Sequence, residues 1–388
     1  MSVEVVSLGC RMNLAESEHM RALLAGERDM VVINSCAVTA EALRQTRQAI
    51  RKARRTRPDA RLMVTGCAVE VEREAIAALD IDGLIANADK LDARAWNVPP
   101  APALPVPSGQ HTRAFVAVQN GCDHACTFCI IPAGRGPSRS RAIPDVVAEV
   151  RAHAEAGVGE VVLTAVDLTG WNHGDQRLGD LVAAILRDVP TLPRLRLSSM
   201  DGVEIDPLLR EIIASEARVM PHLHLSLQHG ADLILKRMKR RHSRADAVDL
   251  VAALKTRRPD IAVGADLIAG FPTEDEAAHA DNLSIIDELG VVHGHIFPYS
   301  ARHGTPAARM PQLPRPLVSQ RAAELRNAVA TRRAVWLESL IGQPQTVLAE
   351  RDGTGHAENF ARIALPAGST PGQMLTITPT RITEGLLS

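Results

Sequence analysis

The chain is predicted to be an α/β protein with three folded parts: an open parallel sheet covered by helices, a partial (β/α) barrel and a small C-terminal β-barrel. Short, strongly apolar runs alternate with helical stretches through most of the 388 residues, which is the pattern of parallel sheets. The final segment instead alternates apolar and polar residues, as antiparallel strands do. The length also exceeds that of one ordinary hydrophobic core, so several domains are expected.

Residues 1–97 are predicted to form the N-terminal domain. Four short runs, VEVVSL, MVVINS, RLMVTG and GLIAN, are rich in β-branched residues, and helical stretches such as 40–57 and 69–79 lie between them. This order predicts an open parallel sheet covered by helices. The next segment contains VPPAPALPVPSG, which is rich in proline and has no periodicity, so we expect a stiff linker over 98–110.

Residues 111–341 are predicted to form a complete or partial parallel barrel. Strand-like runs recur from about residue 113 to 300, most of them followed by a helical interval, and a charged amphipathic helix ends the region at 316–340. From 342 to 388 the runs QTVLAER, ENFARIAL and QMLTITPTRI alternate like the strands of a small antiparallel barrel.

The composition argues against several classes of protein. Three Trp, one Tyr and five Phe are too few for a platform that stacks bases on aromatic rings. The net charge of −1 provides no overall field toward an anionic partner. No apolar run reaches the length of a membrane span, and the N-terminus lacks the pattern of a signal peptide. We therefore expect a cytoplasmic protein whose six cysteines stay reduced and serve metal binding or catalysis.

Three of these cysteines, Cys122, Cys126 and Cys129, lie in NGCDHACTFCII directly after a predicted strand. Thiolates this close in one loop can wrap a cubic iron–sulfur cluster, and three ligands to four irons leave one iron open. A zinc loop or a redox thiol cluster is the alternative. A structural zinc normally takes four protein ligands, however, and His124 lies inside the loop, where it is poorly placed to join them. The spacing favours the cluster.

The other three cysteines, Cys10, Cys36 and Cys67, each follow a predicted strand. In a parallel sheet the carboxyl ends of the strands meet at one edge, so these residues are expected to converge in space. The alternative is three buried free cysteines that act as small hydrophobic side chains. Their recurrence at three successive strand ends favours a second cluster with an open iron.

The cysteine loop followed by a barrel pattern, with Phe128 before the third cysteine, resembles the radical S-adenosylmethionine superfamily. Together with the strand-end cysteines and the small β domain, it resembles the methylthiotransferases of that superfamily. Residues 342–388 resemble a TRAM domain, a small RNA-binding β-barrel, mainly through GHAENFARI. The resemblance implies two 4Fe-4S clusters, S-adenosylmethionine as cofactor, a low-potential electron donor of flavodoxin or ferredoxin type, and replacement of a C–H bond by C–S–CH3.

Within that family, residues 34–55 and 129–141 are similar to the MtaB type, which acts on N6-threonylcarbamoyladenosine in tRNA. The MiaB type, which acts on isopentenyladenosine in tRNA, and the RimO type, which acts on a ribosomal-protein aspartate, are the alternatives. A non-catalytic electron carrier and a zinc-bearing RNA-binding module are alternatives from other classes.

The resemblance also implies four contacts to the cofactor. Phe128, Asp167, Gln228 and Arg240 are expected to bind S-adenosylmethionine, with Asp167 accepting from the amino group and Arg240 suited to the carboxylate. The sequence has alanine and valine at 165–166 where the family pattern has glycines, which weakens the backbone part of that contact. No catalytic residue beyond the six cysteines is assigned.

Two basic stretches, 44–61 and 236–244, suggest a path for the tRNA backbone. The first holds eight Lys or Arg against one Asp, and the second holds six with no acid. Arg135, Arg139 and Arg141 beside the cysteine loop are expected to extend the path. The alternative is that each stretch is an ordinary solvated helix face.

Overall fold

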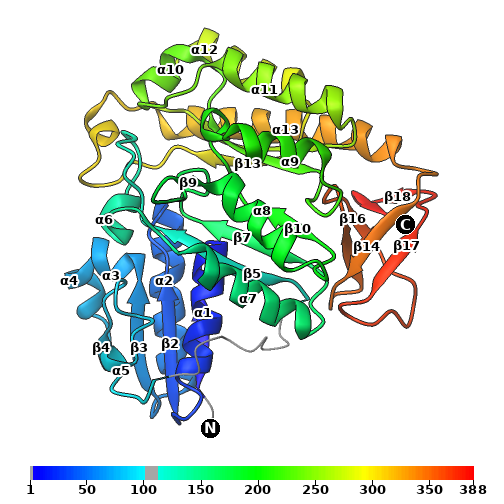
Figure 1. The fold of residues 1–388 in the computed structure, drawn as a ribbon. Coiled ribbons are helices and arrows are strands. Elements are labelled where there is room, and N and C mark those ends of the chain that lie inside the picture. Colours follow the sequence, from blue (N-terminus) through cyan, green and yellow to red (C-terminus); the bar gives the residue numbers. More distant parts are fainter. Residues whose placement is uncertain (1–2, 101–111) are drawn as a thin grey trace.

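The computed structural model describes residues 3–100 and 112–388, and it contains three sheet-bearing regions in chain order (Figure 1). The α/β architecture and the three parts agree with the prediction. Most of the expected linker at 98–110 lies outside the described residues. The boundaries assigned to the three domains stay predictions.

The N-terminal region is a parallel sheet in the order β1-β2-β3-β4, as predicted. Its strands are β1 (Glu4–Ser7), β2 (Met30–Ser35), β3 (Arg61–Gly66) and β4 (Gly83–Leu84). Its helices are α1 (Arg11–Leu23), α2 (Ala40–Thr56), α3 (Cys67–Val71), α4 (Arg73–Ala77) and α5 (Ala93–Trp96). Alternate residues of β2 point to opposite faces, so Val31 and Ile33 pack in one core while Val32 packs in the other with Met20 of α1. Both faces of the sheet are therefore buried.

The middle region is a partial barrel of six parallel strands. These are β5 (Ala114–Asn120), β7 (Val161–Ala165), β10 (Leu195–Leu197), β11 (His222–Gln228), β12 (Ala262–Ala269) and β13 (Val291–Pro298). Backbone hydrogen bonds between β10 and the segment just before β11, such as Met220 N to Leu195 O at 2.9 Å, join the two halves of the barrel. Among the described residues β5 and β13 do not pair, and α1 of the N-terminal region contacts β5.

Helices cover the outside of this barrel, and most of them connect one strand to the next. They are α6 (Ile131–Arg135), α7 (Ile143–Glu155), α8 (Leu178–Asp188), α9 (Pro207–Ser215), α10 (Asp232–Arg237), α11 (Arg244–Arg257) and α12 (Glu276–Leu289). Shorter elements are β6 (Arg139–Ser140), β8 (Asn172–His173), β9 (Gln176–Arg177), η1 (Gly202–Glu204) and η2 (Pro306–Arg309). Side-chain caps fix several helix starts, for example Asp206, which accepts from Leu209 N at 2.9 Å.

The C-terminal region is a six-stranded, mainly antiparallel sheet in the order β17-β14-β15-β16-β19-β18. Its strands are β14 (Gln345–Ala349), β15 (Thr354–Ala357), β16 (Arg362–Ala364), β17 (Met374–Ile377), β18 (Ile382–Thr383) and β19 (Leu386–Leu387). The long helix α13 (Arg315–Ser339) leads into it from the barrel (Figure 1). This agrees with the small β domain predicted from the sequence.

Buried arginines join the C-terminal sheet to the base of the barrel. Arg196 forms a two-pronged ion pair with Glu160 at 2.7 and 2.9 Å, and it also donates to the carbonyl of Glu358 at 3.0 Å. Arg194 donates to the carbonyl of Thr346 at 2.7 Å. These bonds satisfy backbone carbonyls at the contact, and they fix the orientation of the sheet on the barrel.

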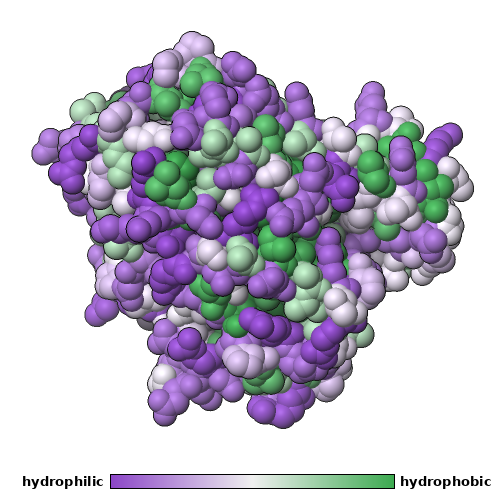
Figure 2. All heavy atoms as spheres, turned by 90° about the horizontal axis from the view of Figure 1, so that it is seen from above, coloured by the Kyte–Doolittle hydropathy of each residue, from purple (hydrophilic) through white to green (hydrophobic). Residues whose placement is uncertain are grey.

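Hydrophilic residues cover most of the face seen in Figure 2, and the hydrophobic residues visible there occur in small groups. Within the described part of the chain, none of the helices has the length and hydropathy needed to span a bilayer.

Candidate active site

A cavity of about 330 Å³ opens at the carboxyl ends of the barrel strands. The loop that carries Cys122, Cys126 and Cys129 forms part of its wall, and residues at the ends of β7, β11 and β12 line the rest together with Val38 and Thr39 of the N-terminal region. Parallel strands bring their carboxyl ends to one side of a barrel, so residues distant in sequence meet there. All four residues expected to bind S-adenosylmethionine line this cavity.

The cysteine loop begins at Gly121, a position where a side chain would not fit. Gly121 has φ +78°, and a Cβ there would lie 1.9 Å from the carbonyl oxygen of Pro137. Backbone N–H groups donate to two of the sulfurs: His124 to Cys122 and Ile131 to Cys129, both at 3.4 Å. Sulfurs that accept backbone hydrogen bonds are typical of iron–sulfur ligands. The environment of the loop fits a cluster.

The three thiols of the loop differ in acidity. Burial raises the pKa of Cys122 to about 11 and that of Cys129 to about 12. Burial alone would also raise the pKa of Cys126, but hydrogen bonds from His124 and Arg240 lower it below its usual value. Two of the three thiols therefore need the positive charge of bound metal to ionise at neutral pH.

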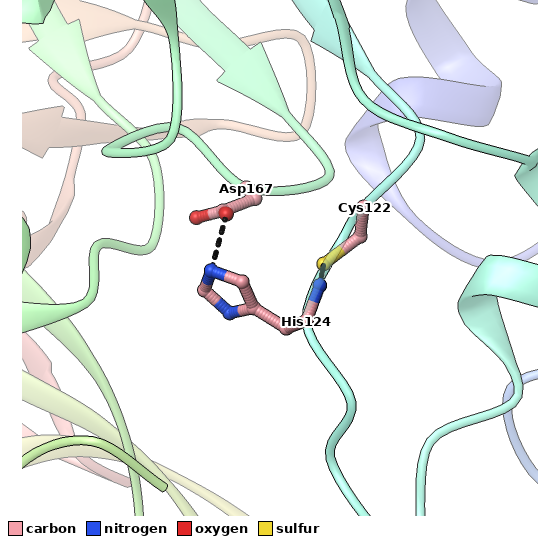
Figure 3. A group of neighbouring side chains, drawn as sticks. All are labelled: Cys122, His124 and Asp167. Carbon is pink, nitrogen blue, oxygen red and sulfur yellow. Dashed lines mark hydrogen bonds and ion pairs between the residues drawn. The ribbon is translucent and has the colours of Figure 1, made fainter.

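His124 turns toward Asp167 (Figure 3). Its Nε2 lies 3.3 Å from Oδ2 of Asp167, and these groups form a compact set with the Cys122 sulfur, all within 4.8 Å of one another. Hydrogen bonds to Cys126 and Glu204 raise the pKa of His124 to about 10. A protonated imidazole has no lone pair for a metal, so the histidine acts as a cation beside the loop.

The spacing of the three sulfurs argues against a single zinc ion. Zn–S bonds of ~2.3 Å in a tetrahedron would place the sulfurs roughly 3.8 Å apart. Among the described residues, the three loop cysteines do not form a group whose ligand atoms all lie within 4.8 Å. The loop therefore does not present its three sulfurs at the spacing of one tetrahedral zinc ion, and the role of these cysteines as cluster ligands stays a prediction.

The structure also brings Cys10, Cys36 and Cys67 together at one edge of the N-terminal sheet. Gly9, with φ +92°, packs so closely on Cys36 that a Cβ would lie 2.6 Å from its sulfur. Burial, with smaller contributions from the nearby sulfurs of Cys10 and Cys67, raises the pKa of Cys36 to about 11. Asn87 Nδ2 lies 3.9 Å from the Cys67 sulfur. The convergence inferred from strand ends is present, while the role of these cysteines as ligands stays a prediction.

Arg135 joins the two cysteine sets. It lies on α6, directly after the cysteine loop, and it is only 6% exposed. Its guanidinium donates to Glu16 at 2.9 Å and to Asn13 at 2.5 Å, both on α1, and to Asn120 at 2.8 Å. The expectation that Arg135 contacts a phosphate backbone is therefore wrong, because its donors are used inside the protein.

The other basic residues divide in the same way. Arg141 pairs with Glu149 at 2.6 Å and is half-buried, so it is also a poor phosphate contact, whereas Arg139 is exposed. In the first basic stretch, Arg54 pairs with Asp82 at 2.8 Å. The exposed members of that stretch whose side chains form no hydrogen bond or ion pair with a described residue are Arg51, Lys52, Arg55 and Arg61.

Of the residues expected to bind the cofactor, Arg240 already has a carboxylate partner. Its Nη2 lies 2.8 Å from Asp201 Oδ2 and 2.7 Å from the carbonyl of Ser226, while Nη1 lies 3.6 Å from the Cys126 sulfur. Phe128 packs edge-to-face against Phe271, with ring centroids 6.5 Å apart. Their contacts to S-adenosylmethionine stay predictions.

Gln228 has φ +71°, a strained value for a residue with a side chain, at a break in the register of β11. Such strain is common where a strand end faces a ligand, and Gln228 lines the cavity.

Sequence reasoning missed Asp201, which also lines the cavity. Asp201 follows β10, so its place after a strand was a usable signal.

A second compact polar group, formed by His224, Asp266 and His295 on three neighbouring barrel strands, adjoins the cavity through Asp266. His224 Nε2 and His295 Nδ1 each lie 3.0 Å from the same oxygen of Asp266, which itself lines the cavity. Burial alone would raise the pKa of Asp266, but the two histidines hold it well below its usual range. The alternation of β11, β12 and β13 places all three side chains inward, a pattern that HLHL, GAD and HGH carry in the sequence.

Comparisons with known proteins agree with this site. Residues 116–283 match the Radical SAM superfamily, and residues 2–85 match a family described as Uncharacterized protein family UPF0004. The threonylcarbamoyladenosine tRNA methylthiotransferase MtaB of Rickettsia prowazekii is 40% identical over 99% of this chain and 96% of its own. The tRNA-2-methylthio-N(6)-dimethylallyladenosine synthase of Cereibacter sphaeroides is 31% identical over 96% of this chain and 89% of its own.

Solved structures share the fold. The radical S-adenosylmethionine methyltransferase TsrM from Kitasatospora setae, solved with cobalamin and a [4Fe-4S] cluster, aligns with a TM-score of 0.55 at 17% identity, over 77% of this chain and 69% of its own. The apo form of the radical enzyme OxsB also aligns with a TM-score of 0.55, at 11% identity, over 86% of this chain and 56% of its own.

Radical SAM enzymes use S-adenosylmethionine with a 4Fe-4S cluster, and methylthiotransferases of the MtaB and MiaB types carry two such clusters. The two cysteine sets of this chain fit that requirement in number, burial and placement. Identity to relatives extends over nearly the whole sequence. The chain is an enzyme and belongs to the radical S-adenosylmethionine methylthiotransferase family.

Proposed function

We propose that this enzyme inserts a methylthio group at carbon 2 of N6-threonylcarbamoyladenosine, next to the anticodon of tRNA. The observation that carries the proposal is the 40% identity, over 99% of the chain, to an enzyme named for that reaction. The dimethylallyladenosine branch, at 31% identity, is the second candidate. Incubating the anaerobically purified enzyme with S-adenosylmethionine, a reductant and tRNA bearing either nucleoside tests the choice. Mass spectrometry of the digested tRNA should show the methylthio product on threonylcarbamoyladenosine alone.

We infer that Cys122, Cys126 and Cys129 hold the cluster that contacts S-adenosylmethionine, while the second set holds the sulfur-carrying cluster. When bound, the two clusters and S-adenosylmethionine would supply the radical, the sulfur and the methyl group, with the electron coming from an external donor. The protein orients them: backbone N–H groups donate to the sulfurs, and residues of the barrel line the cavity. His124 and Arg240 place positive charge beside Cys126, which stabilises its thiolate.

Two triple alanine variants separate the cysteine roles. The variant at Cys122, Cys126 and Cys129 should lose 5′-deoxyadenosine formation and keep roughly half the iron, given four irons per cluster. The variant of the second set should still form 5′-deoxyadenosine but no methylthio product, because the sulfur-carrying cluster is absent. Methylthio product from the second variant at the wild-type level would contradict the assignment. Retained cofactor cleavage in the first would do the same.

We propose that tRNA lies along the exposed part of the first basic stretch. The triple variant Arg51→Ala, Lys52→Ala, Arg55→Ala should weaken tRNA binding and lower the slope of log affinity against log salt by about 2–3, because each phosphate contact contributes roughly 0.7–0.9. Arg54→Ala is not informative, since Arg54 is held by Asp82. Arg94→Ala, an exposed arginine paired with Asp92, is the control and should leave the slope unchanged. An unchanged slope in the triple variant would refute this surface.

The remaining partners follow from the same reaction. The cluster needs an electron at low potential, so we propose a flavodoxin or ferredoxin as the donor. We propose a cytoplasmic location because tRNA is modified there. The domain division at 1–97, 98–110, 111–341 and 342–388 is proposed on the sheets described above, with the last segment serving as a TRAM-like RNA contact.

A further inference from the structure

Three arginines from distant parts of the chain gather on one aromatic ring at the base of the barrel. Phe360, from the C-terminal region, lies 4.9 Å from the guanidinium carbon of Arg196, 5.5 Å from that of Arg113 and 5.8 Å from that of Arg11. We call Arg11, Arg113 and Arg196 the cation group. Arg11 is the first residue of α1, directly after Cys10.

Two members of the cation group have carboxylate partners, and the third has none. Arg196 pairs with Glu160 at 2.7 Å, and Arg113 pairs with Glu350 at 2.8 Å. Arg11 makes no hydrogen bond or ion pair to any residue within 3–100 and 112–388; its contact is the Phe360 ring. Its positive charge is therefore poorly compensated.

The nearby acids are already engaged. Asp266, whose charge favours the protonated form of Arg11, accepts hydrogen bonds from His224 and His295. Glu160 is held in two-pronged fashion by Arg196. A guanidinium that is taken out of water without an acceptor costs free energy, and it is stabilised by any anion that reaches it. Arg11 is half-buried, so part of it stays accessible to a ligand.

The backbone of Arg11 is adjacent to the second cysteine set, while its side chain extends to Phe360 at the base of the barrel. Its backbone neighbour is Cys10 of the second cysteine set, and α1 packs on β5 at the unpaired edge of the barrel. Asp266, which acts on Arg11 electrostatically, also lines the cavity that holds the cysteine loop. Arg11 itself does not line that cavity, so an anion that it binds would lie on the Phe360 side of Asp266, within reach of a long substituent on a base held in the cavity.

We propose that Arg11 binds the carboxylate of the threonylcarbamoyl group and thereby selects that nucleoside; this rests on the proposed function. The threonyl part of the modification ends in a free carboxylate, whereas a dimethylallyl group is uncharged and has no hydrogen-bond acceptor. The planar fork of a guanidinium matches a carboxylate with two parallel hydrogen bonds. A neutral group at the same place would leave Arg11 desolvated without a partner, so the site rejects it.

The test compares two anticodon stem–loops with the wild-type holoenzyme. One carries N6-threonylcarbamoyladenosine, and the other carries the same nucleoside with its carboxylate converted to a neutral methylamide. The measured quantity is the ratio of the two kcat/KM values for methylthio product. We expect the wild-type enzyme to prefer the carboxylate by roughly 100-fold or more, because a site built for a charged group strongly rejects the analogue that lacks it.

Variants assign this preference to Arg11. In Arg11→Gln the ratio should fall to about 1, and in Arg11→Lys, which keeps the charge but not the fork, it should be intermediate. Arg113→Gln is the matched control, because Arg113 belongs to the cation group but is paired with Glu350, and its ratio should stay near the wild-type value. The ratio is internal to each variant, so a general loss of activity does not affect it, and iron analysis verifies both clusters.

The outcomes are distinct. If the wild-type enzyme modifies the threonylcarbamoyl stem–loop but treats the methylamide equally, the inference is overturned and the proposed function stands. A preference that persists in Arg11→Gln overturns it as well. If the wild-type enzyme instead modifies a dimethylallyladenosine stem–loop and leaves both threonylcarbamoyl substrates unmodified, the proposed function and this inference both fall.

Discussion

The buried carboxylate of Glu16 is predicted to hold the N-terminal sheet against the barrel, and Glu16→Gln tests this. Glu16 lies on α1 and accepts hydrogen bonds from Arg135 at 2.9 Å and from Lys90 Nζ at 2.6 Å. The three side chains belong to residues that are 2%, 6% and 1% exposed, respectively. Burial alone would raise the pKa of Glu16, but the two cations lower it, so the carboxylate is charged at neutral pH.

The arrangement sets the size of the effect. Glu16→Gln leaves two buried cations facing one another without an anion, and breaking a buried ion pair by removing one partner costs about 3–5 kcal/mol of unfolding free energy. Arg135→Met leaves the Glu16–Lys90 pair intact and neutral. It removes the hydrogen bonds of Arg135 but leaves no uncompensated buried charge. Because an uncompensated buried charge carries the larger penalty, the loss for Glu16→Gln should exceed the loss for Arg135→Met.

The assay is unfolding in urea, which does not screen charges, followed by tryptophan fluorescence without bound clusters. Trp96 reports on the N-terminal region and Trp171 on the barrel, and each is at most 3% exposed. In each measured protein, Phe replaces every tryptophan except the probe, so the fluorescence comes from Trp96 alone or from Trp171 alone. The transition seen by Trp96 should move to lower urea in Glu16→Gln. The exposed Arg94→Met, which removes a surface pair, should not move it measurably.

Two results would refute this reasoning. If Glu16→Gln behaves like Arg94→Met, the buried carboxylate does not support the interface. If Arg135→Met is the more damaging change, the hydrogen bonds to Asn13 and Asn120 matter more than the charge balance. A double variant, Glu16→Gln with Arg135→Met, leaves Lys90 as the remaining buried cation, so it should lose less than the two single changes added together.

Two further predictions concern a glycine and a histidine. Gly9→Ala should lower the iron bound by the second cysteine set, because its Cβ would lie 2.6 Å from the Cys36 sulfur at φ +92°, whereas Gly26→Ala, which has no atom within 4 Å, should retain full iron. Burial lowers the pKa of His293 to about 3, so this residue is neutral in the fold but takes up a proton in the unfolded chain below pH ~6.5. Above that pH, His293 causes no loss of unfolding free energy. As the pH falls toward 3, protonation of the unfolded chain lowers the unfolding free energy by about 1.4 kcal/mol per pH unit. His293→Gln should reduce the dependence of Tm on pH between 7 and 5, and an unchanged dependence would contradict the assignment.

Much of the site could be predicted because it follows from strand topology. Cys10, Cys36 and Cys67 are 26 and 31 residues apart, yet each follows a strand of one parallel sheet, and the order of such strands puts their ends side by side. Cys122 and its two partners lie in one short loop, so their proximity needs no tertiary information. Periodicity and spacing were sufficient for both sets.

Charge pairing could not be predicted in the same way. Arg135 and Arg54 were interpreted as parts of a basic surface, but their partners Glu16 and Asp82 are 119 and 28 residues away. A sequence shows how many charges a segment has, whereas the pairing depends on which distant elements pack against it. The fork of Arg240 was assigned to the cofactor for the same reason, and the structure shows its hydrogen bond to Asp201.

The short helix α6 fixes the relation between the two cysteine sets. It starts two residues after Cys129, and on its other side Gly134 packs against Cys67, where an added Cβ would approach that of Cys67 to 3.2 Å. Its backbone at Gly134 accepts from Asn87 Nδ2 at 2.6 Å, and Arg135 binds α1. Five residues of helix therefore separate the two sets, with no flexible loop between them. In the proposed reaction, a radical formed at one site acts on a substrate that receives sulfur from the other, and a short helical spacer of this kind would keep both sites within reach of a single base.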